Sequence, residues 1–273
     1  MSSPFTISIE FNYHSGEFIL EFTGKVLGKR YSELISKETI LTCFEKINEL
    51  GYCVVDPAKM MSATVVKCDV TKDIPVEDTK SLNKWIKGNI SNYQKYTCRV
   101  LGNGNLIVEK NVTTHKRKKR MTIYNKEKEM ALSKEREFVE TNNLTNTFSG
   151  LCRFELNLTS QQQIREALGI TGNTLLEVLN SNRNPIADFM DEVMIDGSSQ
   201  SENSNKYWKQ YVRSLVLRDC NYDIEQVDAR LREYYDAGNV SITQKMKPFR
   251  EMLAVRDEKT SVWTKEKLLK ALQ

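Results

Sequence analysis

The chain has 273 residues, of which 40% are apolar and 28% charged, and its formal net charge is +4. This composition is typical of a soluble globular protein, and no run of about 18 apolar residues predicts a membrane span. The two histidines, His14 and His115, are too few for a three-histidine metal site, and no CxxC pair indicates a zinc ribbon. The first residues lack the basic and apolar parts of a secretory signal, so we expect a cytoplasmic protein.

The first half of the chain predicts a mixture of strands and helices. Apolar residues alternate on both sides of a turn at 13–17, and Gly102-Asn-Gly-Asn105 is typical of a second tight turn. The predicted elements up to residue 112 are a hairpin over 5–22, a helix over 37–50, a strand over 63–71, a helix over 78–94, and a hairpin formed by 97–101 and 106–112.

A basic block follows the second hairpin. Residues 110–136 hold ten basic and three acidic side chains, so this block carries +7 and the rest of the chain −3. A polyanion such as nucleic acid is the partner that this block favours, and the alternative is a solvated loop or a processing signal. The run itself is formed by Lys116, Arg117, Lys118, Lys119 and Arg120.

Strands and helices continue to the end of the chain, and a polar linker divides them. A strand is predicted over 120–125, helix-favouring sequence over 126–140, a strand over 151–158, and helices from 160 to 168 and, with an interruption, from 175 to 194. Residues 198–205 resemble a linker. Four helices follow it, near 206–219, 223–237, 242–256 and 264–272. We therefore predict domains at 1–197 and 206–273.

Three of the predicted strands place polar side chains on one face and apolar side chains on the other. In 65–71, 121–126 and 151–158, successive side chains point to opposite sides, as in any strand. If the three strands share a sheet, one face displays Lys67, Asp69, Tyr124, Lys126, Arg153 and Glu155. Carboxylates, cations and a phenol together are suited to phosphoryl transfer, but half-exposed strands with water-facing polar sides alternate in the same way.

At these strands the sequence resembles the rolling-circle replication initiators of phages and plasmids, of the filamentous-phage gene II/X type and the related Rep_trans initiators. The matching stretches are Val65-Val-Lys-Cys-Asp-Val-Thr-Lys-Asp73, Met121-Thr-Ile-Tyr-Asn-Lys-Glu-Lys-Glu129 and Cys152-Arg-Phe-Glu-Leu156. The resemblance covers about residues 7–168. It implies a replication-initiator or relaxase-like α+β fold with a largely antiparallel sheet and packed helices, followed here by a small all-helical C-terminal domain.

The resemblance also implies an activity. Proteins of this kind nick one strand of an origin, stay linked to the 5′ phosphate through a tyrosine, and later rejoin strands. Carried over to this chain, Tyr124 is the nucleophile and Lys126 the phosphate-binding cation. Asp69, Glu155 and Glu129 are the expected ligands of Mg²⁺ or Mn²⁺. We expect the basic run, together with Lys67 and Arg153, to bind DNA.

The sequence departs from the family in two places. It has no His-hydrophobe-His metal motif, so metal binding would depend on carboxylates, and Lys67 stands where the family often has arginine. Expected partners are single-stranded or supercoiled origin DNA, with a host replication helicase or polymerase and a second copy of the chain left open. The alternatives are a non-catalytic DNA-binding or copy-control protein on the same fold and, third, an RNA-directed nuclease or ligase.

Overall fold

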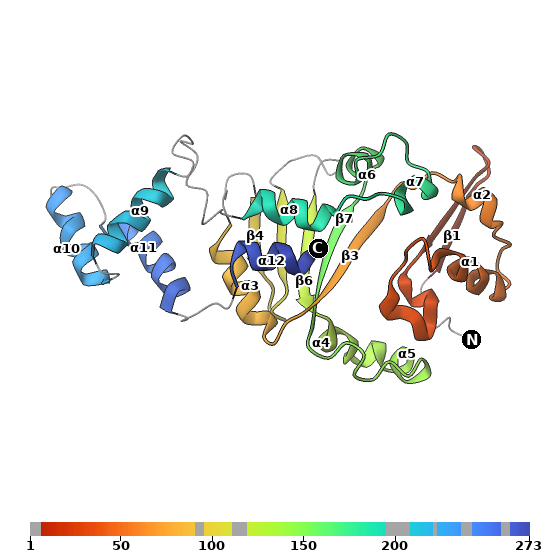
Figure 1. The fold of residues 1–273 in the computed structure, drawn as a ribbon, viewed down its shortest axis with the longest axis horizontal. Helices are drawn as coiled ribbons and strands as arrows, with labels where there is room; N and C mark the ends of the chain where they lie inside the picture. The colour runs from red at the N-terminus through yellow and green to blue at the C-terminus, as the bar shows by residue number, and fades with distance from the viewer. Residues whose placement is uncertain are drawn as a thin grey trace. The chain divides into compact units, whose positions relative to one another are not determined.

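The computed structural model describes residues 7–90, 96–110, 119–194, 208–220, 223–235, 242–257 and 263–273 (Figure 1). The strands are β1 (Ile7–Asn12), β2 (Glu17–Phe22), β3 (Cys68–Pro75), β4 (Tyr96–Val100), β5 (Leu106–Lys110), β6 (Arg120–Asn125) and β7 (Leu151–Leu158). The helices before residue 195 are η1 (Gly24–Glu33), α1 (Ile40–Glu49), α2 (Pro57–Met61), α3 (Thr79–Gly88), α4 (Lys126–Met130), η3 (Ser133–Glu135), α5 (Arg136–Thr141), α6 (Gln161–Leu168), α7 (Leu175–Leu179) and α8 (Pro185–Val193).

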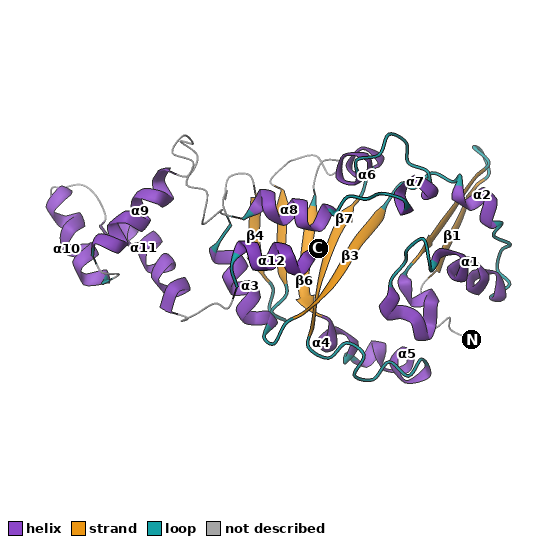
Figure 2. Ribbon diagram, viewed as in Figure 1, coloured by secondary structure: helices purple, strands orange, loops and turns teal. Residues whose placement is uncertain are grey.

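The strands form two sheets. β1 and β2 make a two-stranded sheet, and the other five are ordered β3-β7-β6-β5-β4, with β7 between β3 and β6 (Figure 2). The pairs β3–β7, β6–β7 and β4–β5 are antiparallel. The predicted α+β class with a largely antiparallel sheet and several helices is therefore confirmed.

Strand β7, which lies between β3 and β6, buries one face completely. Cys152, Phe154, Leu156 and Leu158 alternate along it, and each exposes 1% of its surface or less. Met121 and Ile123 of β6 are buried on this same face, because Ile123 pairs with Phe154 and Met121 with Leu156. Apolar burial on this side leaves the other face of the three strands for polar side chains.

A second core lies under the small hairpin. α1 buries side chains at the spacing of an amphipathic helix, and the cluster includes Val26, Leu27 and Val55. Ile7, Leu20 and Phe22 of the hairpin pack against it. The hairpin is thus attached to the protein through its base, next to α1 and α2 (Figure 1).

The chain divides into two compact units, each assembled from two segments. One unit is 1–77 with 112–186, and the other is 78–111 with 187–273. The predicted linker, 198–205, lies outside the described residues, so the predicted domain boundary stays a prediction. In the part of the chain that the structure describes, no helix is both long and apolar enough to cross a bilayer.

The helices predicted near the C-terminus are present. They are α9 (Trp208–Asp219), α10 (Ile224–Tyr234), α11 (Ile242–Asp257) and α12 (Lys265–Leu272). α9, α10 and α11 share a small core that contains Leu217, Val227 and Phe249. Lys265, at the start of α12, donates hydrogen bonds to the carbonyl oxygens of Asp191 and Met194 and so ties α12 to the end of α8.

Some predicted boundaries differ from the structure. The strand predicted over 63–71 lies at 68–75, because β7 pairs with every residue from Cys68 to Pro75. The helix-favouring stretch 126–140 is divided into α4, η3 and α5. The irregular η1, which is interrupted at Gly28 where φ is +57°, was not predicted.

Candidate active site

The strand register brings the predicted polar side chains to one face. β7 lies between the other two strands, so each of three residues on it has a partner on both sides. The three rows are Asp69–Asn157–Arg120, Thr71–Glu155–Thr122 and Asp73–Arg153–Tyr124. Members of successive rows are two residues apart, so all nine side chains point to the same side of the sheet. The shared face that the alternation predicted is therefore observed for Asp69, Tyr124, Arg153 and Glu155.

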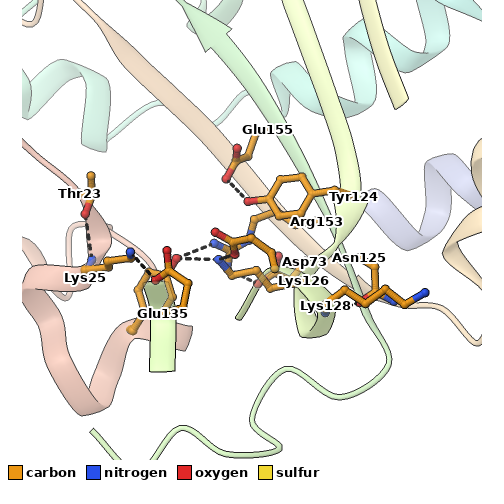
Figure 3. A network of polar contacts seen from close by, with 12 residues as sticks. Thr23, Lys25, Asp73, Tyr124, Asn125, Lys126, Lys128, Glu135, Arg153 and Glu155 are labelled. Carbon is orange, nitrogen blue, oxygen red and sulfur yellow. Dashed lines mark hydrogen bonds and ion pairs between the residues drawn. The ribbon is translucent and has the colours of Figure 1, made fainter. Parts of the chain in front are cut away.

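Tyr124 is hydrogen-bonded to a carboxylate on this face. Its hydroxyl donates to Glu155 Oε1 at 2.7 Å, across one diagonal of the sheet (Figure 3). The side chain is 8% exposed. Burial raises the pKa of Tyr124 well above its usual value, the charges of Glu155 and Glu129 raise it further, and Arg153 opposes the shift. The resting state is therefore a neutral phenol whose proton points at a base.

Glu155 is the base in this pair. Burial raises the pKa of its carboxyl group, and the charge of Asp69 acts in the same direction. The hydrogen bond from Tyr124 and the charges of Arg153 and Lys126 oppose that rise. A carboxylate with a raised pKa accepts a proton more readily than an exposed one, which suits a general base.

Lys126 follows Tyr124 by two residues but lies in α4. Asn125 ends the strand and caps the helix, because its side chain accepts a hydrogen bond from the Lys128 backbone at 2.7 Å. Lys126 is buried at the first helical position. Its ammonium group donates to the hydroxyl of Tyr31 at 2.8 Å and forms an ion pair with Glu129.

Arg153 is the second buried cation. Its guanidinium group makes two hydrogen bonds of 2.6 Å to the carboxylate of Asp73, and its Nη1 donates to the Tyr31 hydroxyl at 3.2 Å. Burial alone would lower the pKa of Arg153, but the hydrogen bond and charge of Asp73 raise it. Figure 3 shows Arg153, Asp73 and Lys126 gathered beside the Tyr124 ring.

Sequence reasoning missed Tyr31 and Asp73. Tyr31 comes from η1 and packs edge-on against Phe138 and Phe148, with ring centroids 5.4 and 5.5 Å away. Nothing local in the sequence connects it to Lys126, 95 positions later. Asp73 could have been found, because extending the strand alternation from Asp69 by four residues places it on the same face.

The remaining predicted residues lie in different surroundings. Asp69 is exposed and accepts a hydrogen bond from the Asn157 side chain at 2.8 Å. Lys67 lies just before β3, exposed, and pairs with Glu21 at 2.8 Å. Lys116, Arg117 and Lys118 lie outside the described residues. Lys119 is half-buried, and Arg120 is exposed at the first position of β6.

The predicted metal ligands are partly brought together. Asp69 and Glu155 share the face, in adjacent rows, whereas Glu129 is paired with Lys126. Among the described residues, no group of three or more His, Cys, Asp or Glu side chains is arranged to hold a metal ion. Two carboxylates nevertheless fit Mg²⁺ or Mn²⁺, since such ions are commonly held by one or two carboxylates plus water and substrate phosphate.

No family model, no curated protein and no solved structure matches this chain. The resemblance to rolling-circle initiators therefore depends on the three short motifs alone. Chemically, the arrangement is a phenol hydrogen-bonded to a buried carboxylate, with a second carboxylate in the next row and two buried cations behind it.

Proposed function

We propose that this protein is a rolling-circle replication initiator, which nicks one DNA strand through Tyr124 and later rejoins strands. The observation that carries the proposal is the 2.7 Å hydrogen bond from Tyr124 to Glu155 on the face that also holds Asp69. A nucleophile within hydrogen-bond reach of a base is the usual arrangement in covalent catalysis. The proposal includes a replication-initiator-like fold and a helical C-terminal domain.

The proposed step conserves the phosphodiester bond energy. The Tyr124 oxygen attacks phosphorus, and its proton passes to Glu155. The bond from phosphorus to the 3′ oxygen breaks, and that oxygen leaves as the 3′ hydroxyl after protonation by water. The 5′ phosphate stays on Tyr124 as a diester, so a later attack by a 3′ hydroxyl can reverse the step and join strands.

Asp69 and Glu155 are the residues that would hold Mg²⁺ or Mn²⁺. When bound, such an ion polarises the phosphodiester and offsets the charge that develops on its oxygens. The chain's own contribution is to keep the two carboxylates on one rigid sheet, in adjacent rows.

DNA would approach this face over Arg120. A phosphate could reach Lys126 only by displacing Glu129, and Arg153 only by displacing Asp73. Arg120 is exposed and lies four residues before Tyr124 on the same face, about 13 Å along the strand. We therefore assign the first phosphate contact to Arg120 and give Lys126 and Arg153 a role in the electrostatics around Tyr124.

A specific observation favours the non-catalytic alternative. Tyr124 is only 8% exposed, so attack on DNA requires the site to open locally when DNA binds. A copy-control protein that binds DNA on the same fold would not need this opening.

One experiment separates the two functions. The full chain is incubated with Mn²⁺ and a labelled single-stranded DNA library of random sequence, and covalent adducts are read on a denaturing gel. Wild type is expected to give an adduct that Tyr124→Phe abolishes. Tyr96→Phe is the matched control, because Tyr96 is also a buried tyrosine hydrogen-bonded to a glutamate, Glu192.

The other outcomes are equally clear. Salt-sensitive DNA binding by wild type without any adduct would support the non-catalytic protein. An adduct that persists in Tyr124→Phe would assign the nucleophile to another residue. An adduct that forms undiminished in excess chelator would reject the metal site.

A further inference from the structure

The β1–β2 hairpin has one apolar face and one acidic face. Its register pairs Ile7 with Phe22, Ile9 with Leu20 and Phe11 with Phe18, so these six side chains share a side. The opposite side holds Ser8, Glu10, Asn12, Glu17, Ile19 and Glu21. No lysine or arginine occurs from residue 7 to residue 22.

The apolar face continues outward beyond the core of the protein. At the base, Ile7, Leu20 and Phe22 pack against the cluster around α1. Toward the tip, exposure rises from 37% at Ile9 to 51% at Phe11 and 88% at Tyr13. Exposed aromatic groups in a contiguous patch are typical of protein interaction sites.

The tip is held in a defined conformation. The Asn12 side chain accepts hydrogen bonds from the backbone N–H groups of His14 and Ser15. The backbone carbonyl oxygen of Asn12 accepts a further hydrogen bond from the Gly16 N–H at 2.8 Å. The rings of Phe11 and Tyr13 meet edge to face, with centroids 4.9 Å apart. A preformed turn lowers the entropy cost of binding a partner.

The hairpin also offers backbone groups. In the described parts of the chain, β1 and β2 form a sheet of their own, which leaves an outer edge on each strand. Such edges accept an additional strand from a partner. A partner strand would place alternate side chains on the apolar face and on the acidic face.

We propose that the β1–β2 hairpin binds an extended protein segment in which apolar side chains alternate with lysine or arginine. The apolar residues would lie beside Ile9, Phe11 and Phe18, and the basic ones beside Glu10 and Glu17. Glu21 of the same acidic face already forms an ion pair with Lys67 of this chain at 2.8 Å. A nucleic acid would be repelled by three glutamates, and a second copy of the hairpin would bring acid against acid. This proposal is independent of the proposed function.

The test uses the full chain and three labelled twelve-residue peptides. One alternates valine and lysine, one alternates valine and glutamate, and one contains the valines and lysines in shuffled order. Fluorescence polarisation measures affinity, and amide hydrogen exchange locates the contact. We expect only the alternating valine–lysine peptide to bind, with slowed exchange in β1 or β2 and weaker binding at high salt.

Variants of the hairpin make the test specific. Phe11→Ser and the double change Glu10→Gln with Glu17→Gln are each expected to weaken binding by about tenfold or more. Tyr52→Ser is the control, because Tyr52 is 67% exposed but lies outside the hairpin. Hydrogen exchange in α1 confirms that each variant keeps its fold.

Four results would overturn the proposal. The three peptides could bind alike, or the hairpin variants could bind as wild type does. A single-stranded oligonucleotide that slows exchange in the hairpin would make it a nucleic-acid surface. Sedimentation showing a dimer that Phe11→Ser dissociates would make the occupant a second copy of the chain.

Discussion

Lys126 and Arg153 donate hydrogen bonds to the same phenolic oxygen, that of Tyr31, while each keeps its own carboxylate partner. Burying two cations side by side costs free energy that an apolar core of the same size would not. Helix dipoles also disfavour a lysine at the first position of a helix, where Lys126 stands. Perturbed pKa values, such as those of Tyr124, Arg153 and Glu155 in this cluster, are more common at functional sites than elsewhere.

The Arg153–Asp73 pair gives the first stability prediction. Asp73→Ala leaves the buried guanidinium group without its two carboxylate hydrogen bonds, so we expect the free energy of unfolding to fall by about 3–5 kcal/mol. Asp69→Ala, on the same strand and face but exposed, should cost about 1 kcal/mol or less. Urea unfolding measures both, and equal losses would contradict the burial argument.

The raised pKa of Glu155 makes the stability of the protein depend on pH. Because burial raises its pKa, the folded protein binds a proton at this site more readily than the unfolded chain. Its contribution to stability is therefore greatest below the unfolded pKa of about 4.3 and decreases as pH rises through the folded pKa.

Glu155→Gln tests this dependence. Glutamine cannot ionise and still accepts the Tyr124 hydrogen bond, so the free energy of unfolding should fall less between about pH 4.5 and pH 7 than in wild type. Urea unfolding across this pH range measures the slope. Glu17→Gln, at an exposed position, is the control and should leave the slope unchanged. If the free energy of unfolding of Glu155→Gln depends on pH as steeply as that of wild type, Glu155 is not the group that causes the dependence.

At the scale of the element, the junction of β6 and α4 positions the site. Asn125 ends the strand that carries Tyr124 and caps the helix that carries Lys126. Asn125→Ala removes the cap and should lower the free energy of unfolding by about 1 kcal/mol. Asn125→Asp keeps the acceptor and adds a charge that the helix N-terminus favours, so it should retain wild-type stability. Similar losses in both variants would show that the cap is not responsible.

Helices and strands whose apolar residues recur at a regular spacing were predictable. Elements that are defined by contacts between residues far apart in the sequence were not. The strand at 120–125 and the helices at 175–179 and 185–193 agree with the pattern, because alternation and Pro185 mark them locally. The predicted strand over 63–71 begins too early, since β3 is fixed by its pairing with β7, whose residues lie 76 to 90 positions further along the chain. The shared polar face was predictable because alternation along each strand is local. The contribution of Tyr31 was not, because its contact with Lys126 joins residues 95 positions apart.

At the scale of the whole molecule, charge position matters more than net charge. The basic block, residues 110–136, carries +7 on a chain whose other residues carry −3, and Arg120 within it lies on the face of Tyr124. If the block binds single-stranded DNA, each phosphate contact contributes about 0.7 to the slope of log affinity against log salt. Replacing Lys116, Arg117, Lys118, Lys119 and Arg120 by glutamine should reduce that slope by up to about 3.5.

A matched variant separates the block from net charge. Glutamine at Lys29, Arg30, Lys37, Lys46 and Lys59, all exposed, changes the net charge by the same amount, from +4 to −1. Filter binding over a series of salt concentrations should give this variant a slope close to that of wild type, because all five of its lost charges lie outside the basic block. If both variants lose the same slope, binding follows the overall charge, and the path over Arg120 to Tyr124 is wrong. If only the variant changed at residues 116–120 has a reduced salt slope, the polyanion is held next to the proposed nucleophile, Tyr124.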